Sequence, residues 1–209
     1  MSQKLRTLEQ NIALLRVENK LLKEEKRVLT EELAYLKKAL QDSSRDDLTG
    51  MLRRTMFQEL ADEHLCILRR HPGRSLSLLV VDLNNLKTIN DRYGHPAGDK
   101  VLIAFANLLN SSLRDGDLIA RGSAGGDEFL VLLPEQNEKG ADAARLHLLE
   151  EFEEYKKVIL PAFFGAAVGA ATVTAEEQGK LSKTFDDLYQ EADEAMYKNK
   201  RLLKEQEEK

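Results

Sequence analysis

Two groups of acidic residues in this chain stand at the ends of apolar runs, where side chains can do chemistry. Asp82 closes the run LSLLVV, and Asp127 with Glu128 follows Gly125 and Gly126 and opens the run FLVLL. Two carboxylates at the rigid ends of neighbouring strands can hold Mg²⁺ while phosphate oxygens and water complete its coordination. The glycines leave room for a nucleotide to approach the backbone. Either group alone is common at solvated strand ends, so the predicted metal site depends on their combination.

The segment between these groups, residues 82–102, adds polar side chains suited to a nucleotide base. Asp99 could accept hydrogen bonds from the ring N–H and the exocyclic amine of guanine. Asn90 could supply both a donor and an acceptor, and adenine offers a different pattern. The alternative is structural: Asn90 caps a turn and Asp99 caps the following helix. The segment by itself favours that alternative.

The elements that position these residues lie beyond residue 45, where strand-like and helix-like runs are mixed. Hydrophobic periodicity predicts helices over 48–71, 97–113, 139–157 and 184–203, and strands over 76–82, 117–122, 128–133 and 163–171. Gly125 and Gly126 fall between the second and third strands and predict a hairpin turn. Helices interleaved with a hairpin indicate an α+β sandwich in which helices cover a mainly antiparallel sheet.

Residues 5–40 follow a heptad repeat with two seam positions. The first position holds Leu5, Ile12, Asn19, Lys26, Leu33 and Leu40, and the second holds Leu8, Leu15, Leu22, Leu29 and Leu36. This pattern predicts a long coiled-coil helix. Asn19 in the seam favours a parallel homodimer in register, because paired asparagines satisfy each other, and Lys26 discourages higher oligomers. A lone amphipathic helix packed on the globular domain is the alternative, but the seam is narrow for such a helix.

The heptad ends at the polar segment QDSSR, residues 41–45. We therefore predict a stalk with a short linker over residues 1–45 and a globular domain over residues 46–209. Asp46 or Asp47 could cap a helix at the start of that domain. A chain of 209 residues is long enough for one ordinary domain with such an extension.

The composition excludes several kinds of partner and site. A formal charge of −5 argues against binding to nucleic acid or to anionic lipid through a broad surface. Cys66 is the only cysteine, which excludes an intrachain disulfide and a cysteine-rich zinc site and favours the reducing cytoplasm. The first ten residues lack the apolar run of a signal peptide. The weakly polar stretch 158–173 is shorter than a membrane span and predicts a buried strand, so no membrane contact is expected and any membrane signal would need an upstream sensor.

Four blocks of the sequence match one family pattern in order. They are DDLTG at 46–50, DLNNLKTINDRYGHPAGD at 82–99, GGDEF at 125–129 and ADEAMYKNK at 192–200. GGDEF is the unaltered signature of the GGDEF-domain family, the diguanylate cyclases. The second block resembles that family's D-x-D-x-F-K-x-x-N-D-x-x-G-H-x-x-G-D motif, and the outer blocks resemble its start and its end. The resemblance covers residues 46 to 204.

This resemblance implies a cyclase- or palm-like βααββαβ core and an enzyme that condenses two GTP molecules into cyclic di-GMP with release of two pyrophosphates. It implies Mg²⁺, or Mn²⁺ in its place, held by Asp82, Asp127, Glu128 and the Leu83 carbonyl. Glu128 could also help to deprotonate the attacking 3′-hydroxyl. The implied substrate contacts are the guanine readers Asn90 and Asp99, the phosphate contacts Lys87, Lys200 and Lys204, the backbone at Asn85 and Leu86, and Gly125 and Gly126.

Two regulatory features also follow from the resemblance. The family faces two domains, each with one GTP, across a two-fold axis. Residues 5–40 would supply that homodimer, and the register of the coiled coil could regulate the reaction. Arg114 and Asp117, in RDGD, resemble the family's R-x-x-D site at which cyclic di-GMP inhibits the enzyme. Arg145 is a candidate for the second arginine of that site.

Departures from the family pattern define the alternative functions. Asn84 replaces a common aspartate. Residues 122–124 stand between Arg121 and Gly125, where the family usually has one residue, and the extra residues could bulge the hairpin and shift Asp127. The chain would then be a degenerate GGDEF domain that binds GTP or cyclic di-GMP and signals by contact. A structural coiled-coil protein with an inert domain is a third hypothesis, but it leaves the carboxylates unexplained.

Overall fold

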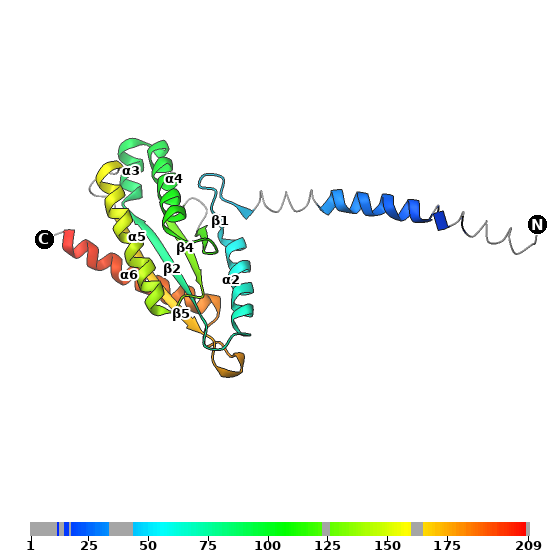
Figure 1. Cartoon of the computed structure of the whole chain (residues 1–209). Helices are drawn as coiled ribbons and strands as arrows, with labels where there is room; N and C mark the ends of the chain where they lie inside the picture. Colours follow the sequence, from blue (N-terminus) through cyan, green and yellow to red (C-terminus); the bar gives the residue numbers. More distant parts are fainter. Residues whose placement is uncertain are drawn as a thin grey trace, which may run out of the picture. The chain divides into compact units, whose positions relative to one another are not determined.

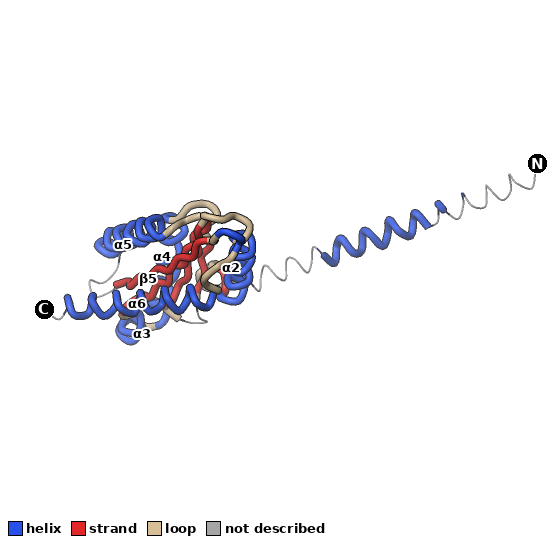
Figure 2. Tube along the Cα trace, turned by 90° about the horizontal axis from the view of Figure 1, so that it is seen from below, coloured by secondary structure: helices blue, strands red, loops and turns tan. Residues whose placement is uncertain are grey.

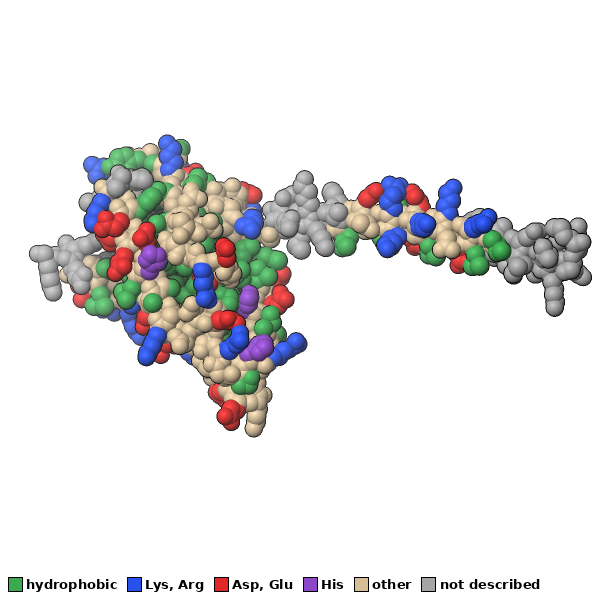
Figure 3. Space-filling view, in the orientation of Figure 1, with side chains coloured by type: hydrophobic (Ala, Val, Ile, Leu, Met, Phe, Trp, Pro, Cys, Tyr) green, Lys and Arg blue, Asp and Glu red, His purple; other side chains and the backbone are tan. Residues whose placement is uncertain are grey.

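The computed structural model describes residues 12, 15, 16, 18–33, 44–122, 126–159 and 165–207. The chain divides into two units, Met1–Ser43 and Ser44–Lys209, which are described separately. In the first unit, residues 18–33 form a helix. Leu22, Leu29 and Leu33, at the predicted seam, are exposed on this helix, and Figure 3 shows apolar side chains along one of its edges. The seam residues Leu5, Leu8, Leu36 and Leu40 lie outside the described residues.

Ion pairs stabilise this helix on its polar side. Arg27 pairs with Glu24 at 2.6 Å and with Glu31 at 2.8 Å, one turn away in each direction. Such exposed pairs contribute little to stability, because water and salt screen them. The polar side of the helix is therefore suited to water, whereas its apolar edge is exposed.

The second unit is built on a five-stranded sheet with strand order β1-β3-β4-β2-β5 (Figure 1). The strands are β1 (Leu52–Arg53), β2 (Ser75–Asn84), β3 (Leu118–Arg121), β4 (Glu128–Pro134) and β5 (Gly165–Thr174). β1 pairs with β3 in parallel, and the other three pairings are antiparallel. The sheet is therefore mainly antiparallel, as predicted.

Helices and one 3₁₀ turn complete this unit. They are α2 (Arg54–Leu68), α3 (Leu86–Tyr93), α4 (His95–Ser112), α5 (Glu138–Ile159), η1 (Glu177–Gly179) and α6 (Phe185–Glu207). From β2 to β5 the order of elements is βααββαβ, which confirms the expected fold. Within the described ranges, no helix is both long and apolar enough to cross a membrane.

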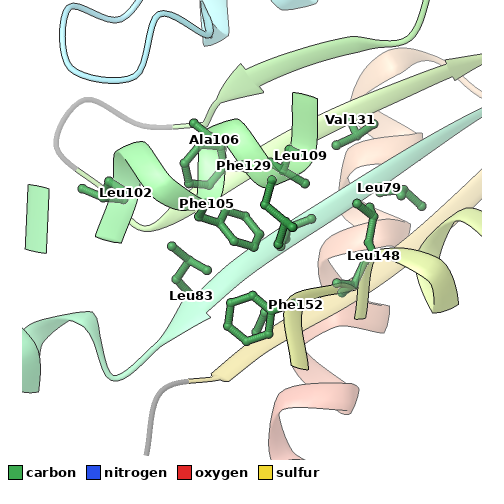
Figure 4. Packing of buried hydrophobic residues seen from close by; sticks show 14 of the residues in the cluster. Leu79, Leu83, Leu102, Phe105, Ala106, Leu109, Phe129, Val131, Leu148 and Phe152 are labelled. Atoms are coloured by element: carbon green, nitrogen blue, oxygen red, sulfur yellow. The ribbon is translucent and has the colours of Figure 1, made fainter. Parts of the chain in front are cut away.

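Alternation along the strands produces a core on each face of the sheet. Val81 of β2 packs in a cluster with α4 and α5, whereas its neighbour Val80 packs in a second cluster with α2 and α6. Figure 2 shows β5 lying between α5 and α6. In the first cluster (Figure 4), the ring of Phe105 lies 5.2 Å from that of Phe129 and 5.6 Å from that of Phe152. Because both faces are buried, the central strands form a rigid base for side chains at their ends.

Close packing of α6 on β5 depends on small residues in the strand. A Cβ atom on Gly169 would lie 2.0 Å from the carbonyl oxygen of Ala192 and 2.2 Å from the backbone nitrogen of Met196. Those contacts are with helix backbone, so only glycine permits this approach. The polar residues of α6 therefore have defined positions over the sheet.

Most predicted elements match the structure to within a few residues, and the largest differences lie at two helices. The helix predicted over 48–71 begins only at Arg54, because residues 46–51 form a turn in which the Asp46 N–H donates to the Met51 carbonyl at 2.8 Å. α3 was not predicted as a separate helix. It has only eight residues and ends at Gly94, whose φ is 83°, before α4 begins at His95. Two turns give too little periodicity to recognise a helix in a polar segment.

Candidate active site

Asp82 and Glu128 are direct cross-strand partners at one end of the central strands β2 and β4. By the alternation of the strands, both side chains lie on the face of the sheet that α2 and α6 cover, and both are half-buried. Asp127 immediately precedes β4, and its carbonyl accepts a hydrogen bond from the Leu83 N–H at 3.0 Å. The backbone thus gathers three acidic residues at one end of the sheet.

Lys200 of α6 contacts this acidic group directly. Its Nζ donates to Asp82 Oδ1 at 2.5 Å. Burial raises the pKa of Asp82 above its usual value, Lys200 partly offsets this, and the negative charges of Asp127 and Asp193 raise the pKa further. The carboxylates are therefore close enough to repel one another, and a cation among them would relieve that repulsion.

The donor set fits a hard divalent cation that shares its coordination with a ligand. Asp82, Asp127, Glu128 and the Leu83 backbone offer oxygen atoms, which Mg²⁺ prefers. Within the part of the chain that the structure describes, no three His, Cys, Asp or Glu side chains converge closely enough to hold a metal by themselves. Phosphate oxygens and water would have to complete the coordination, as is usual for Mg²⁺ at nucleotide sites.

A buried arginine positions the turn that carries Asp127. Arg121, 6% exposed, donates to the Gly126 carbonyl from Nε at 3.1 Å and from Nη2 at 3.0 Å. Its Nη1 lies 3.2 Å from Asp46 Oδ1. Burial disfavours the charged form of Asp46, but hydrogen bonds from Thr49 and Arg121 outweigh it and lower the pKa. Arg121 thus links Asp46, at the start of the domain, to Gly126, the residue before Asp127.

The hairpin that carries the extra residues begins by extending the β3–β4 ladder. The last strand pair is Arg121 with Phe129, and the Gly122 N–H then donates to the Glu128 carbonyl at 2.8 Å. Gly122 also makes room, because a Cβ atom there would lie 2.9 Å from Cδ of Glu128. Ser123, Ala124 and Gly125 lie outside the described residues. The β3–β4 ladder therefore continues as far as Gly122 and Glu128.

Asn90 of α3 lies against Gly98 in the first turns of α4. A Cβ atom on Gly98 would lie 1.9 Å from Asn90 Oδ1, so the amide fills the space that glycine leaves. Asn90 Oδ1 is buried and has no hydrogen-bond partner among the described residues, and Asp99 is exposed. The capping alternative is wrong, since the caps of α3 and α4 are Asn85 and Gly94 and neither cap uses a side-chain hydrogen bond.

The remaining predicted substrate contacts follow β2 or lie on α6. Asn85 adopts a left-handed conformation, with φ of 64°, and turns the chain from β2 into α3. Leu86, buried, and Lys87, exposed, form the first turn of α3, where backbone N–H groups can bind phosphate. Lys204 belongs to α6, but its side chain lies outside the described part of the structure.

The predicted inhibitory residues lie at the other end of β4. Arg114 and Asp117 form the turn between α4 and β3, and Nε of Arg114 donates to Asp117 Oδ1 at 3.1 Å. Arg114 also donates to the carbonyl of Pro134, the last residue of β4. The side chain of Asp117 is only 4% exposed, so Arg114 is the member of this pair that a ligand can reach. Arg145 pairs with Asp142 within α5 at 3.3 Å.

Two residues at the site were missed in the sequence. The hydroxyl of Tyr189, on α6, donates to Glu128 Oε1 at 2.7 Å. Arg54, at the start of α2, places its guanidinium 4.1 Å from the Tyr189 ring centre and 3.9 Å from Glu128 Oε1. Tyr189 lies outside the four matched blocks, and its only signal is its spacing of three helical turns from Lys200.

Comparison with known proteins gives a consistent result. Residues 43–206 match the family described as diguanylate cyclase, GGDEF domain. Diguanylate cyclase DgcP of Pseudomonas aeruginosa is 36% identical over 172 residues, which are 80% of this chain and 24% of that protein. Diguanylate cyclase DgcM of Escherichia coli is 35% identical over 162 residues, 74% of this chain and 35% of that protein. The chain therefore spans only part of the length of these relatives.

The fold of this chain is also similar to that of a solved structure. The crystal structure of diguanylate cyclase SiaD in complex with its activator SiaC, from Pseudomonas aeruginosa, matches with a TM-score of 0.67 at 28% identity. The match covers 95% of this chain and 76% of that one.

Proposed function

Since this chain belongs to the family of diguanylate cyclase GGDEF domains, we propose that it joins two GTP molecules into cyclic di-GMP and releases two pyrophosphates. The observation that carries the proposal is the pairing of Asp82 with Glu128 across β2 and β4, with Asp127 at the adjoining turn and Lys200 reaching into the same group. This arrangement offers oxygen ligands and a cation for phosphate at one place.

The proposed reaction is an attack of a ribose 3′-oxygen on the α-phosphorus of the facing GTP. The new P–O bond forms as the bond to the bridging oxygen of pyrophosphate breaks, and the proton of the 3′-hydroxyl passes to Glu128 or to water. When bound by Asp82, Asp127, Glu128 and the Leu83 carbonyl, Mg²⁺ or Mn²⁺ would neutralise the charge that develops on the phosphate oxygens. Lys200 can exchange its bond to Asp82 for one to a phosphate oxygen, while Lys87 lies in the first turn of α3.

Guanine selection is proposed for Asn90 and Asp99. Oδ1 of Asn90 is buried and has no partner in the described part of the chain, which costs free energy until a ligand donor reaches it, and guanine carries such donors. Asp99, exposed one residue beyond Gly98, would accept from the ring N–H and the exocyclic amine.

Replacing Gly98 with alanine should therefore impair GTP recognition. The new Cβ atom would displace the Asn90 amide from a position 1.9 Å away. We expect KM for GTP to rise about tenfold, or about 1.4 kcal/mol, with weaker discrimination against ATP. Steady-state kinetics with both nucleotides would measure this. Gly140→Ala, on α5 and away from the site, is the matched control, because the new Cβ atom would lie 2.0 Å from the amide oxygen of Gln136. Equal KM values in both variants would contradict the role of Asn90.

Dimerisation through the stalk is also proposed. Each domain holds one GTP, so two domains must face each other, and a parallel coiled coil over residues 5–40 would tether them. Exposed Leu22, Leu29 and Leu33 support this proposal, since an unpaired apolar edge on a lone helix is unfavourable. The likeness to SiaD, whose structure contains a bound activator, supports the further proposal that a sensor or partner protein acts on this dimer.

Product inhibition is proposed at the RDGD turn, and Arg114→Ala should relieve it. The Arg114 side chain is half exposed, and its guanidinium can hold phosphate or a guanine edge with two hydrogen bonds, which alanine cannot. We expect the initial rate to stay unchanged and the concentration of cyclic di-GMP for half-inhibition to rise at least about tenfold. Progress curves would show the difference. Arg114 also donates hydrogen bonds to Asp117 and to the Pro134 carbonyl, so a melting curve of the variant is needed to show that its stability is unchanged. Progress curves of the variant that level off at the same product concentration as the parent would reject this site.

One assay tests the central proposal. Purified protein is incubated with GTP and Mg²⁺, and the nucleotides are separated by chromatography. We expect cyclic di-GMP and pyrophosphate in a ratio of one to two, with no cyclic product from ATP. Tight GTP binding without turnover would instead identify a binding module.

A further inference from the structure

Tyr189 is fixed in the site by contacts on several sides. Its hydroxyl donates to Glu128 Oε1 at 2.7 Å. The ring stacks on Phe185, with 6.5 Å between ring centres, and the Arg54 guanidinium lies 4.1 Å from the ring centre on α2. A phenol held in this way by packing and a cation can orient the group to which it donates.

The Glu128 carboxylate is correspondingly enclosed by three elements. Tyr189 contacts it from α6, and Arg54 approaches the same oxygen to 3.9 Å from α2. On the hairpin, a Cβ atom on Gly122 would lie 3.1 Å from Glu128 Oε2 and 2.9 Å from Cδ. The carboxylate thus has little freedom to rotate while the Tyr189 hydrogen bond is in place.

The same helix holds both carboxylates of the cross-strand pair. Tyr189 and Lys200 are eleven residues apart, which is about three helical turns, so they lie on one side of α6. Lys200 bonds Asp82 and Tyr189 bonds Glu128, while Asp82 and Glu128 face each other across β2 and β4. The close approach of α6 to β5 at Gly169 fixes the helix that makes both bonds.

We propose that Tyr189 is a positioning residue that fixes the Glu128 carboxylate beside Asp82 for the metal-assisted reaction, an inference that rests on the proposed cyclase function. Partners that orient a ligating carboxylate commonly change metal affinity or rate about ten- to a hundredfold when they are removed. Tyr189 does not touch substrate in this role, because it acts through Glu128.

Tyr189→Phe tests the inference, since phenylalanine keeps the ring and its packing and removes only the hydroxyl. We expect kcat to fall at least about tenfold while KM for GTP stays within about twofold of the parent. Mn²⁺ affinity, titrated in the presence of a non-reactive GTP analogue, should weaken by a similar factor. Tyr155→Phe is the matched control, because Tyr155 is also half-buried on a helix but packs against the other core cluster. It should behave as the parent in both measurements.

A second variant shows whether Tyr189 acts through Glu128. In Glu128→Ala, adding Tyr189→Phe should weaken Mn²⁺ binding no further, because the carboxylate that Tyr189 positions is gone. Losses that multiply in the double variant, or a Tyr189→Phe protein with the parent's kcat and Mn²⁺ affinity, would overturn the inference. If the parent makes no cyclic di-GMP, the proposed function fails and the Mn²⁺ titration still decides on Tyr189. A parent that also binds no Mn²⁺ beside the analogue would refute both.

Discussion

Asp127→Asn is expected to lower the rate of cyclic di-GMP formation at least about a hundredfold, which corresponds to about 2.7 kcal/mol of transition-state stabilisation. Asparagine has nearly the volume of aspartate, and the backbone bond from Leu83 to the residue 127 carbonyl is retained, so the fold should persist. The loss comes from one carboxylate of the group around Asp82, because the negative charge that would help to hold the cation is removed. Initial rates with GTP and Mg²⁺, together with a melting curve, would measure the effect.

Asp62→Asn is the control for this variant. It makes the same change of charge on an exposed position of α2 and should leave the rate within about twofold of the parent. Turnover by Asp127→Asn close to that of Asp62→Asn would remove Asp127 from the mechanism. Any metal would then have to be held by residues other than those of the turn that Arg121 contacts.

The long strands of the sheet could be predicted because they carry strong signals. LSLLVV and FLVLL are continuous apolar runs, as expected for strands buried on both faces, and both lie in the centre of the observed sheet. The short elements could not be predicted in the same way. β1 has two residues and pairs in parallel with β3, so it is defined by a distant partner and not by its own sequence.

The part of the candidate site that could be predicted consists of residues whose type and position in the sequence indicate their chemical role. Carboxylates at strand ends and an asparagine near a glycine are visible as a pattern, and the structure places Asp82, Asp127 and Glu128 at one end of the sheet. Tyr189 was missed because a tyrosine in an amphipathic helix usually belongs to the core. Only the close packing of α6 on β5 turns its hydroxyl toward Glu128.

The role of Arg121, which links the start of the domain to the turn before Asp127, was also not recognised in the sequence. Arg121 is buried among the core strands, where an arginine is rare unless it is paired. Its partners, Asp46 and the Gly126 carbonyl, are 75 and 5 residues away in sequence, so spacing gives no hint of the first of them. A buried charged residue beside a signature turn is the one signal that could have indicated this link.

Substitutions on the stalk helix should separate the predicted seam from the rest of its surface. Leu22→Glu with Leu29→Glu places charges at two seam positions and should dissociate the predicted dimer, because like charges would face each other in its core. We expect turnover per chain at about 1 μM protein to fall by up to about a thousandfold, since the domains lose a tether that supplies an effective concentration near 1 mM. Turnover should also become dependent on protein concentration. Sedimentation and initial rates at several protein concentrations would measure both effects.

Leu21→Glu with Val28→Glu is the matched control for the stalk. In the single helix these residues are 66% and 50% exposed, against 55% and 58% for Leu22 and Leu29, so exposure does not distinguish the two pairs. Only the heptad places Leu21 and Val28 one position before the seam, where two helices would leave them in solvent. The control should therefore remain dimeric and active. If both pairs of substitutions have the same effect, the helix does not dimerise through this seam, and a lone helix packed on another surface would explain its apolar edge.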